Sequence, residues 1–318
     1  EGFDPVPGNN IVSFIDIGAT VKSATLSTLT VEVPQGALSG FVTVSANGST
    51  SSPGFYFYVI PQSLDPCEEA VANTSTGSRS RDVAISPDAA TAYVTNSGND
   101  NVSIIDLATF TNTGYIVVGD EPLKIDINPA GTRAYVTNYA EHTVSVIDLT
   151  NETGMRHQVI DVINVGINPY GVIVTPDGER VYVSNFSSGN LSVIDINPSS
   201  GAFDHVVANV NTGTRNRDVT VTADAGLVLV AGDNGLSIIN SKPGDQDYNC
   251  VIANSSSGTK TRDVAITADA GYAVVSTESG YLLVIDIFPE SDYFGTAVAS
   301  ASSSSKIRDV STSGDGLH

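Results

Sequence analysis

The hydrophobic residues of this chain recur in short runs that polar turns separate. Over residues 82–119 the runs are DVAIS, TAYVTN, VSIIDL and TNTGYIVVG, with the turn sequences SPDAAT and SGND after the first two. Turn residues return about every ten positions, and no segment has the i, i+3, i+4 apolar stripe of an amphipathic helix. The pattern predicts an all-β chain in which four short strands form one unit.

This four-stranded unit repeats along the chain. The position of Arg81 recurs at Leu123, Tyr170, Arg217, Arg262 and Arg308, at intervals of 42, 47, 47, 45 and 46 residues. The polar residue near the end of each third strand keeps the same period, at Asp106, Asp148, Asp195, Asn240 and Asp286. Four-stranded repeats of about 40–45 residues are typical of β-propeller blades. We expect five complete blades and a sixth that begins at Arg308, in a ring of seven blades, with six as the alternative.

The repeats resemble a known family in particular residues. AYVTN at 92–96 and 134–138 and VYVSN at 181–185 each follow a turn similar to Pro-Asp-Gly and precede a V-x-V-I-D type of strand. They resemble the YVTN family of β-propeller repeats, over residues 66–318. Four copies begin with Arg-Asp-Val, where the family usually has a sequence similar to Pro-Tyr-Gly. The resemblance implies propeller blades over this part of the chain.

Residues 1–60 do not belong to the repeat. Alternating segments such as NNIVSFIDI at 9–17, with tight turns between them, predict a small β-sandwich. GFDP at 2–5, VSF at 12–14 and VPQGALSGFVTV at 33–44 resemble the IPT/TIG family of immunoglobulin-like domains. That family normally has another strand before Gly-Phe, so we expect the domain to be incomplete at its N-terminal end.

A linker and a propeller follow this domain. PQSLDPCEE at 61–69 is the predicted linker, and 70–318 is the predicted propeller, incomplete at its C-terminal end. AVANTSTG at 70–77 aligns with VVANVNTG at 206–213 and VIANSSSG at 251–258, which are predicted fourth strands. We therefore expect 70–77 to form the outer strand of the last blade and to close the ring.

Charge and cysteine content narrow the classes of partner. The 318 residues include 35 acidic and 14 basic ones, for a formal charge of −21. Nucleic acids and anionic membrane surfaces bind clustered Lys and Arg, so the balance argues against both. No apolar run approaches the ~20 residues of a membrane span. Cys67 and Cys250 are the only cysteines, and we do not expect them to pair, because their predicted blades are not neighbours.

The repeated Arg-Asp pairs are the main candidates for a ligand site. The first strand of a blade lies nearest to the axis, so the pairs should surround one mouth of the central channel. The predicted ligand-binding residues are Arg81, Asp82, Arg217, Asp218, Arg262, Asp263, Arg308 and Asp309. The alternative, which we favour, is that the pairs only connect neighbouring blades as ion pairs and caps. Leu123-Lys124 and Tyr170-Gly171 interrupt the series, which argues against a symmetric ion site.

Other chemistry is sparse in the sequence. No catalytic residue is predicted, because the four histidines stand apart and no nucleophile elbow or P-loop occurs. Asp245 and Asp247 are weak candidates for Ca²⁺, since two carboxylates are too few for a cage. The Asp and Asn residues near the ends of the third strands are expected to form turns. We expect no cofactor, with Ca²⁺ as the one candidate ion.

These features favour a noncatalytic extracellular or cell-surface protein with a structural or adhesive role. The propeller would be an interaction platform for a protein or glycan, or for further copies of this chain. Seven Asn-x-Ser/Thr sequons add weak support for export. The alternative is an enzyme with a site at the central channel, because YVTN-like propellers resemble lactone-hydrolysing propellers in architecture. A shared fold does not by itself assign that activity.

Overall fold

The computed structural model divides the chain into two compact units, residues 1–71 and 72–318. In the first unit it describes residues 6, 10–14, 17–24, 29–32, 40–46, 49–50 and 55–57. In the second it describes residues 74–150, 156–255, 260–303 and 306–312. Within these ranges every regular element is a strand, and no helix long and apolar enough to cross a membrane is found among them.

The described part of the first unit contains six strands. They are β1 (Asn10–Phe14), β2 (Ile17–Ala24), β3 (Leu29–Glu32), β4 (Gly40–Ala46), β5 (Ser49–Thr50) and β6 (Phe55–Phe57). They form one antiparallel sheet in the order β3-β2-β1-β4-β5, and β6 also pairs with β4. The IPT/TIG type of sandwich stays a prediction.

The described part of the second unit contains five four-stranded blades. Blade 1 contains β7 (Ser80–Ile85), β8 (Thr91–Asn96), β9 (Asn101–Asp106) and β10 (Thr111–Val117). Blade 2 contains β11 (Pro122–Ile127), β12 (Arg133–Asn138), β13 (Thr143–Asp148) and β14 (Gln158–Asn164). Blade 3 contains β15 (Pro169–Val174), β16 (Arg180–Asn185), β17 (Asn190–Asp195) and β18 (His205–Asn211). Blade 4 contains β19 (Asp218–Val221), β20 (Leu227–Gly232), β21 (Gly235–Asn240) and β22 (Cys250–Ser255), and blade 5 contains β23 (Thr261–Ile266), β24 (Tyr272–Thr277), β25 (Tyr281–Asp286) and β26 (Ala297–Ser302).

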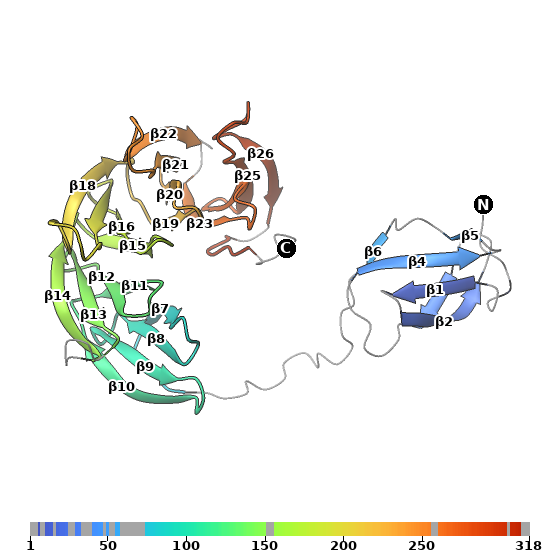
Figure 1. The fold of residues 1–318 in the computed structure, drawn as a ribbon, viewed down its shortest axis with the longest axis horizontal. Helices are drawn as coiled ribbons and strands as arrows, with labels where there is room; N and C mark the ends of the chain where they lie inside the picture. The colour runs from blue at the N-terminus through green and yellow to red at the C-terminus, as the bar shows by residue number, and fades with distance from the viewer. Residues whose placement is uncertain are drawn as a thin grey trace. The chain divides into compact units, whose positions relative to one another are not determined.

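The blades are arranged as in a propeller. In each blade the four strands lie side by side in chain order, and neighbouring strands are antiparallel. The first strands of successive blades contact one another, from β7 through β11, β15 and β19 to β23. Figure 1 shows these strands on the inside of a curved row of blades, with β10, β14, β18, β22 and β26 on its outside. The predicted all-β propeller fold is confirmed.

The hydrophobic core lies between the blades. The middle strands of blades 2 to 4 are buried on both faces, and β13 is buried along its whole length. At the first seam, Tyr93 and Val102 of blade 1 pack in one cluster with Ile127 and Val136 of blade 2. A strand that is buried on both faces needs apolar residues at consecutive positions, which explains the near-continuous apolar runs of the third strands.

The Asn that ends the second strand in blades 1 to 3 fastens a hairpin. Nδ2 of Asn138 donates hydrogen bonds to Thr143 Oγ1 (2.9 Å) and Ser145 Oγ (2.8 Å) in the next strand. Asn96 and Asn185 form the equivalent pairs of bonds in blades 1 and 3. The last residue of the AYVTN segments therefore has a structural role.

The polar residue that ends each third strand forms a turn, as predicted. Oδ1 of Asp106 accepts hydrogen bonds from the backbone N–H groups of Ala108 (2.9 Å) and Thr109 (2.8 Å). In the other blades the equivalent side-chain oxygen also accepts the backbone N–H of the residue two positions later. These residues are Asp148, Asp195, Asn240 and Asp286. These side chains therefore stabilise the turns that follow the third strands.

The first and last described segments of the second unit, 74–77 and 306–312, are not strands. The sequence predicts a strand over 70–77. Residues 74–77 do not form a strand, and no described strand pairs with them, whereas 70–73 lie outside the described residues. The Ser75 carbonyl instead accepts a hydrogen bond from Asn112 Nδ2 (2.9 Å) in β10. Residues 306–312 also form no strand, yet they lie along β23, where Val310 N–H donates to Asp263 Oδ2 (2.7 Å).

Candidate functional site

The starts of the first strands surround a cavity of about 220 Å³. Seven of the predicted ligand-binding residues line it, namely Arg81, Arg217, Asp218, Arg262, Asp263, Arg308 and Asp309. Leu123, Lys124 and Tyr170, which interrupt the Arg-Asp series, complete the lining. Asp82 does not line the cavity, but its carboxylate lies 3.5 Å from Lys124 Nζ. The structure thus brings the repeated dipeptides together at one mouth of the channel, which we call the channel mouth.

The Asp side chains of the channel mouth connect each blade to the next. The bonds run from Ile125 N to Asp82 Oδ2 (3.0 Å), from Val264 N to Asp218 Oδ2 (3.1 Å) and from Val310 N to Asp263 Oδ2 (2.7 Å). In each case the donor is the residue after the second position of the repeated dipeptide in the next blade, which Lys124, Asp263 and Asp309 occupy. Asp126 lies two positions after Lys124 in blade 2, and its Oδ2 accepts the N–H of Val174 in blade 3 (2.7 Å). Backbone amides on an inner strand edge need an acceptor, and these carboxylates supply it.

This capping sets carboxylates of neighbouring blades close together. Burial raises the pKa of Asp263 to about 8, and the neighbouring charge of Asp218 adds to the effect. Burial likewise raises the pKa of Asp218. Burial alone would lower the pKa of Lys124, but the carboxylates around it, Asp82 foremost, outweigh that effect and raise it. Near neutral pH the Asp218–Asp263 pair therefore retains a proton while Lys124 stays charged.

Three of the Arg side chains bind a residue that follows the second strand of their own blade, and Arg217 Nη1 also donates to the Thr261 carbonyl of blade 5 (3.4 Å). Arg81 Nε donates to Ser97 Oγ (2.9 Å). In blades 4 and 5, Arg217 pairs with Asp233 (2.6 Å) and Arg262 with Glu278 (2.7 Å). Neighbouring residues of a strand point to opposite faces, so the Arg and Asp of one dipeptide diverge. Of the predicted contacts between blades, the Asp caps are present, whereas Arg–Asp ion pairs between first strands do not occur among the described residues.

Blades 4 and 5 form a cationic side of the channel mouth. Arg215, Arg217 and Lys260 contact Asp233 (3.4, 2.6 and 3.6 Å), and Lys260 and Arg262 contact Glu278 (3.9 and 2.7 Å). Burial alone would raise the pKa of Asp233, but Arg217 and its neighbours lower it. Arg262 lowers the pKa of Glu278. Four cations therefore share two ionised carboxylates, which leaves an excess of positive charge in a chain whose formal charge is −21.

Blades 2 and 3 form an aromatic side of the channel mouth. Tyr170 stands at the Arg position of blade 3, and Phe186 directly follows the second strand, with the ring centroids 6.3 Å apart. Tyr139, at the Phe186 position of blade 2, lies 6.4 Å from each of the two rings. Arg217 lies over the Phe186 ring, 5.3 Å from its centroid, so that the cationic and aromatic sides meet there.

No side chain can stand at the Asp position of blade 3. A Cβ added to Gly171 would lie 2.9 Å from the backbone oxygen of Arg217 in blade 4. The Gly171 N–H donates to Ser184 Oγ (2.9 Å), and this hydroxyl donates in turn to the Arg217 carbonyl (3.2 Å). Ser184 therefore bridges this seam in place of an Asp, which explains the interruption at Gly171.

The sequence pattern did not reveal the residues that contact the lining side chains of the channel mouth. The missed residues directly follow the second strands: Ser97, Tyr139, Phe186, Asp233 and Glu278. In three blades the partner lies 16 residues after the Arg that it binds. A search for paired chemistry at that spacing could have found them.

The remaining candidates do not converge on a site. Asp245 and Asp247 are exposed, and Asp245 accepts a hydrogen bond from Asn240 Nδ2 (3.1 Å). Within the described ranges no three His, Cys, Asp or Glu side chains are placed to hold a metal ion. Cys250 is exposed and has a free thiol, whereas Cys67 and His318 lie outside the described residues. The weak Ca²⁺ site stays a prediction.

Comparison with known proteins agrees with the propeller fold. A family model described as YNCE-like beta-propeller matches residues 64–291. Hydrazine synthase from Kuenenia stuttgartiensis is similar over 92% of this chain and 88% of that chain, with 21% identity and a TM-score of 0.60. A putative 6-phosphogluconolactonase from Bacteroides uniformis is similar over 74% of this chain and 75% of that chain, with 16% identity and a TM-score of 0.62.

At such identities the two structures share the fold alone with this chain. Among curated proteins none matches the chain. The family model, in contrast, spans four complete blades and the first three strands of blade 5. Because it covers well over half of the sequence, the chain belongs to the YNCE-like β-propeller family.

Proposed function

We propose that this chain is a noncatalytic binding protein of the cell surface or extracellular space, and that the channel mouth is its ligand site. The observation that carries the proposal is the sharing of two carboxylates by four cations beside an aromatic cluster. Guanidinium groups recognise carboxylates through paired hydrogen bonds. Aromatic rings offer a flat apolar face to a ring-shaped ligand.

The chemistry of the channel mouth favours an acidic sugar over other partners. A cavity of about 220 Å³ is smaller than the ~300–1,000 Å³ that hold a drug-sized ligand. It therefore suits a single sugar unit at the end of a glycan. The sugar ring would lie against Tyr170, and its carboxylate would face Arg81, Arg262 or Arg308. Within this proposal the repeats are of the YVTN type, and an IPT/TIG domain serves as the spacer.

A calorimetric titration of the full chain with glucuronate, and with glucose as the uncharged match, tests this proposal. We expect saturable binding of glucuronate, weakened by added salt, and none of glucose. Arg308→Gln should weaken glucuronate binding about tenfold. Lys242→Gln removes an exposed lysine from the turn after β21 and should change nothing. Binding of acidic peptides without glucuronate would assign the site to a protein partner, and binding of neither would contradict the proposal.

Lactone hydrolysis is a second candidate function. Asp263, whose pKa is raised to about 8, could accept or release a proton near neutral pH. The similarity to the putative 6-phosphogluconolactonase supports a shared fold and gives no support for a shared activity. The assay is lactone opening by the full chain, with and without Ca²⁺. Turnover that Asp263→Asn or Asp218→Asn abolishes, without loss of folding, would establish an enzyme and overturn the noncatalytic proposal.

A further inference from the structure

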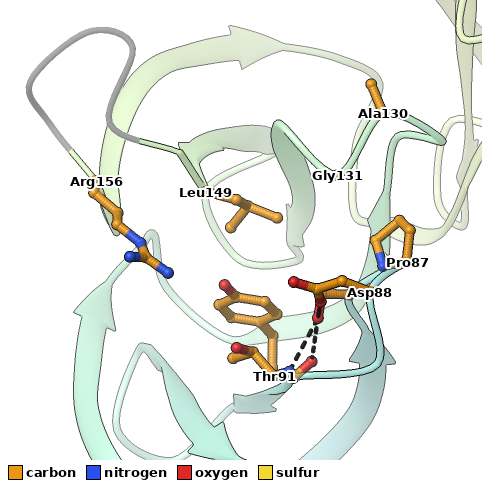
Figure 2. A pocket seen from close by; sticks show the side chains of 9 residues that line it. Pro87, Asp88, Thr91, Ala130, Gly131, Leu149 and Arg156 are labelled. Carbon is orange, nitrogen blue, oxygen red and sulfur yellow. Dashed lines mark hydrogen bonds between the residues drawn. The ribbon is translucent and has the colours of Figure 1, made fainter.

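A second cavity, of about 400 Å³, lies between blades 1 and 2. It opens at the end of β7 opposite to Arg81, and no residue lines both this cavity and the channel mouth. Figure 2 shows Arg156 on one side of it and Asp88 on the other, with Leu149 between them. We call it the seam cavity.

At the other described seams an aromatic ring stands at the corresponding place in the loop. In blades 3, 4 and 5 the rings are Phe203, Tyr248 and Phe294, and each directly precedes a residue with positive φ. That next residue donates its N–H to the carbonyl that ends the third strand, at 2.7–2.8 Å, which fixes the loop in one shape. The rings therefore occupy equivalent places in the three blades.

At two of these seams the ring lies beside the first residue of the second strand in the preceding blade, and at the third it packs on the cluster that contains that residue. The guanidinium of Arg133 lies 4.7 Å from the Phe203 ring centroid. Tyr248 lies beside Arg180, and Phe294 packs on the cluster that contains Leu227. A ring and a large side chain thus fill each of these seams.

The first seam has the same backbone and different side chains. His157 has a φ of 59° and donates its N–H to the Asp148 carbonyl (2.7 Å), as in the other blades. However, Arg156 stands at the position of the aromatic ring, and the small Thr91 stands at the position of Arg133. Both line the seam cavity. The cavity is therefore the space that a ring fills elsewhere in the same propeller.

The walls of the seam cavity carry two opposite charges. Ser86 Oγ and Ala90 N–H both donate to Asp88 Oδ1, at 2.5 and 3.0 Å. The Ser86 bond lowers the pKa of Asp88, which keeps it ionised. Oδ2 of Asp88 accepts no hydrogen bond from a described residue, and Arg156 forms no ion pair within the described part of the chain.

The floor of the cavity is held rigid. Tyr93 is 2% exposed, and its hydroxyl is hydrogen-bonded to His157 Nε2 at 3.1 Å. The two rings meet edge to face, with centroids 5.8 Å apart. Burial, together with the charge of Arg156, lowers the pKa of His157, so the imidazole is neutral at neutral pH. A neutral, packed floor between two charges suits an apolar ring with a polar group at each end.

We propose that the seam cavity binds a small aromatic hydroxy acid. The ring of the ligand occupies the space that Phe203, Tyr248 and Phe294 fill in the other seams. Its carboxylate pairs with the Arg156 guanidinium, and its hydroxyl donates a hydrogen bond to Asp88 Oδ2. This site is separate from the channel mouth and does not depend on the function proposed there.

Calorimetry of the full chain with three probes tests the site. The probes are 4-hydroxybenzoate, benzoate, which lacks the hydroxyl, and phenol, which lacks the carboxylate. We expect 4-hydroxybenzoate to bind about tenfold more tightly than either of the others. Arg156→Gln should weaken the binding of 4-hydroxybenzoate and benzoate but leave phenol unchanged. Arg81→Gln, at the channel mouth, should leave all three affinities unchanged.

Arg156→Phe provides a second, independent test. It places in the first seam the kind of ring that fills the other three, so binding of all three probes should be lost. Filling the cavity should also leave the thermal unfolding midpoint unchanged or raise it, which shows that the variant folds. The proposal is overturned if the wild-type chain shows no saturable binding of 4-hydroxybenzoate. It is equally overturned if Arg156→Gln and Arg156→Phe bind that probe as tightly as the wild type.

Discussion

Asp218 Oδ2 accepts the backbone N–H of Val264 at 3.1 Å, and this bond sets the carboxylate of Asp218 beside that of Asp263. The next blade boundary repeats the arrangement, where Asp263 accepts the N–H of Val310. The hydrogen bonds that hold successive blades together thus place carboxylates next to one another along the channel. The cohesion of the propeller is therefore linked to pH.

Stability should fall as pH rises. The pKa of Asp263 is raised to about 8 and that of Asp126 to about 6, both by burial. Between about pH 4 and these values the folded chain keeps protons that the unfolded chain has lost. The free energy of unfolding therefore decreases across this window and levels off above it. Urea unfolding followed by circular dichroism should give a higher midpoint at about pH 5 than at about pH 8.

Asp263→Asn isolates the contribution of that carboxyl. The amide cannot ionise, yet its oxygen can still accept the Val310 N–H. We expect a flatter pH profile and a higher midpoint than wild type at about pH 8. Asp245→Asn, at an exposed position, is the control and should reproduce the wild-type profile. A profile that Asp263→Asn leaves as steep as before would show that other groups set the pH dependence.

The hairpin bonds of Asn185 should matter for stability. Asn185 is fully buried (0% exposed), and its Nδ2 donates to Asn190 Oδ1 and Ser192 Oγ, both at 2.9 Å. Asn185→Ala leaves these acceptors without their donor and should lower the free energy of unfolding by about 1–3 kcal/mol. Gln246→Ala removes an exposed amide and should have no measurable effect. Equal midpoints for the two variants in urea would rule out this role.

Gly171 should tolerate no side chain. A Cβ there would lie 2.9 Å from both the Arg217 carbonyl oxygen and Ser184 Oγ. Gly171→Ala must push blades 3 and 4 apart, at a cost of about 1–3 kcal/mol. Gly201→Ala is the matched control, because nothing lies within 4 Å of its added Cβ. Thermal unfolding of the two variants compares them, and an unchanged midpoint for Gly171→Ala would show that the seam can relax.

The fold could be predicted from the sequence because the four-stranded unit repeats along the chain. The spacing of the Arg81 position predicts which residues lie at the same place in each blade, and seven of the eight predicted site residues do line one cavity. The strands and turns follow from alternation and from the Asp and Asn turn formers. Leu123 and Tyr170 interrupt the Arg-Asp series in sequence, yet they line the same cavity as the Arg residues.

What the sequence did not reveal depends on contacts across strands and blades. Pairing of Arg217 with Asp233 requires the register of a hairpin, and the cap of Asp218 on Val264 requires the approach of two blades. Neither leaves a local pattern of residues. The seam cavity is a more extreme case, because Arg156 is notable only beside Phe203, Tyr248 and Phe294 in their equivalent places.

The role of the channel mouth is tested most directly by glucuronate titration of Tyr170→Ala beside the wild-type chain. The ring of Tyr170 is on the aromatic side and lines the cavity. We predict saturable binding to the wild-type chain and an affinity about tenfold lower in the variant, since stacking on the ring is lost. Absence of saturable binding to the wild type, or the same affinity in Tyr170→Ala, would contradict the account.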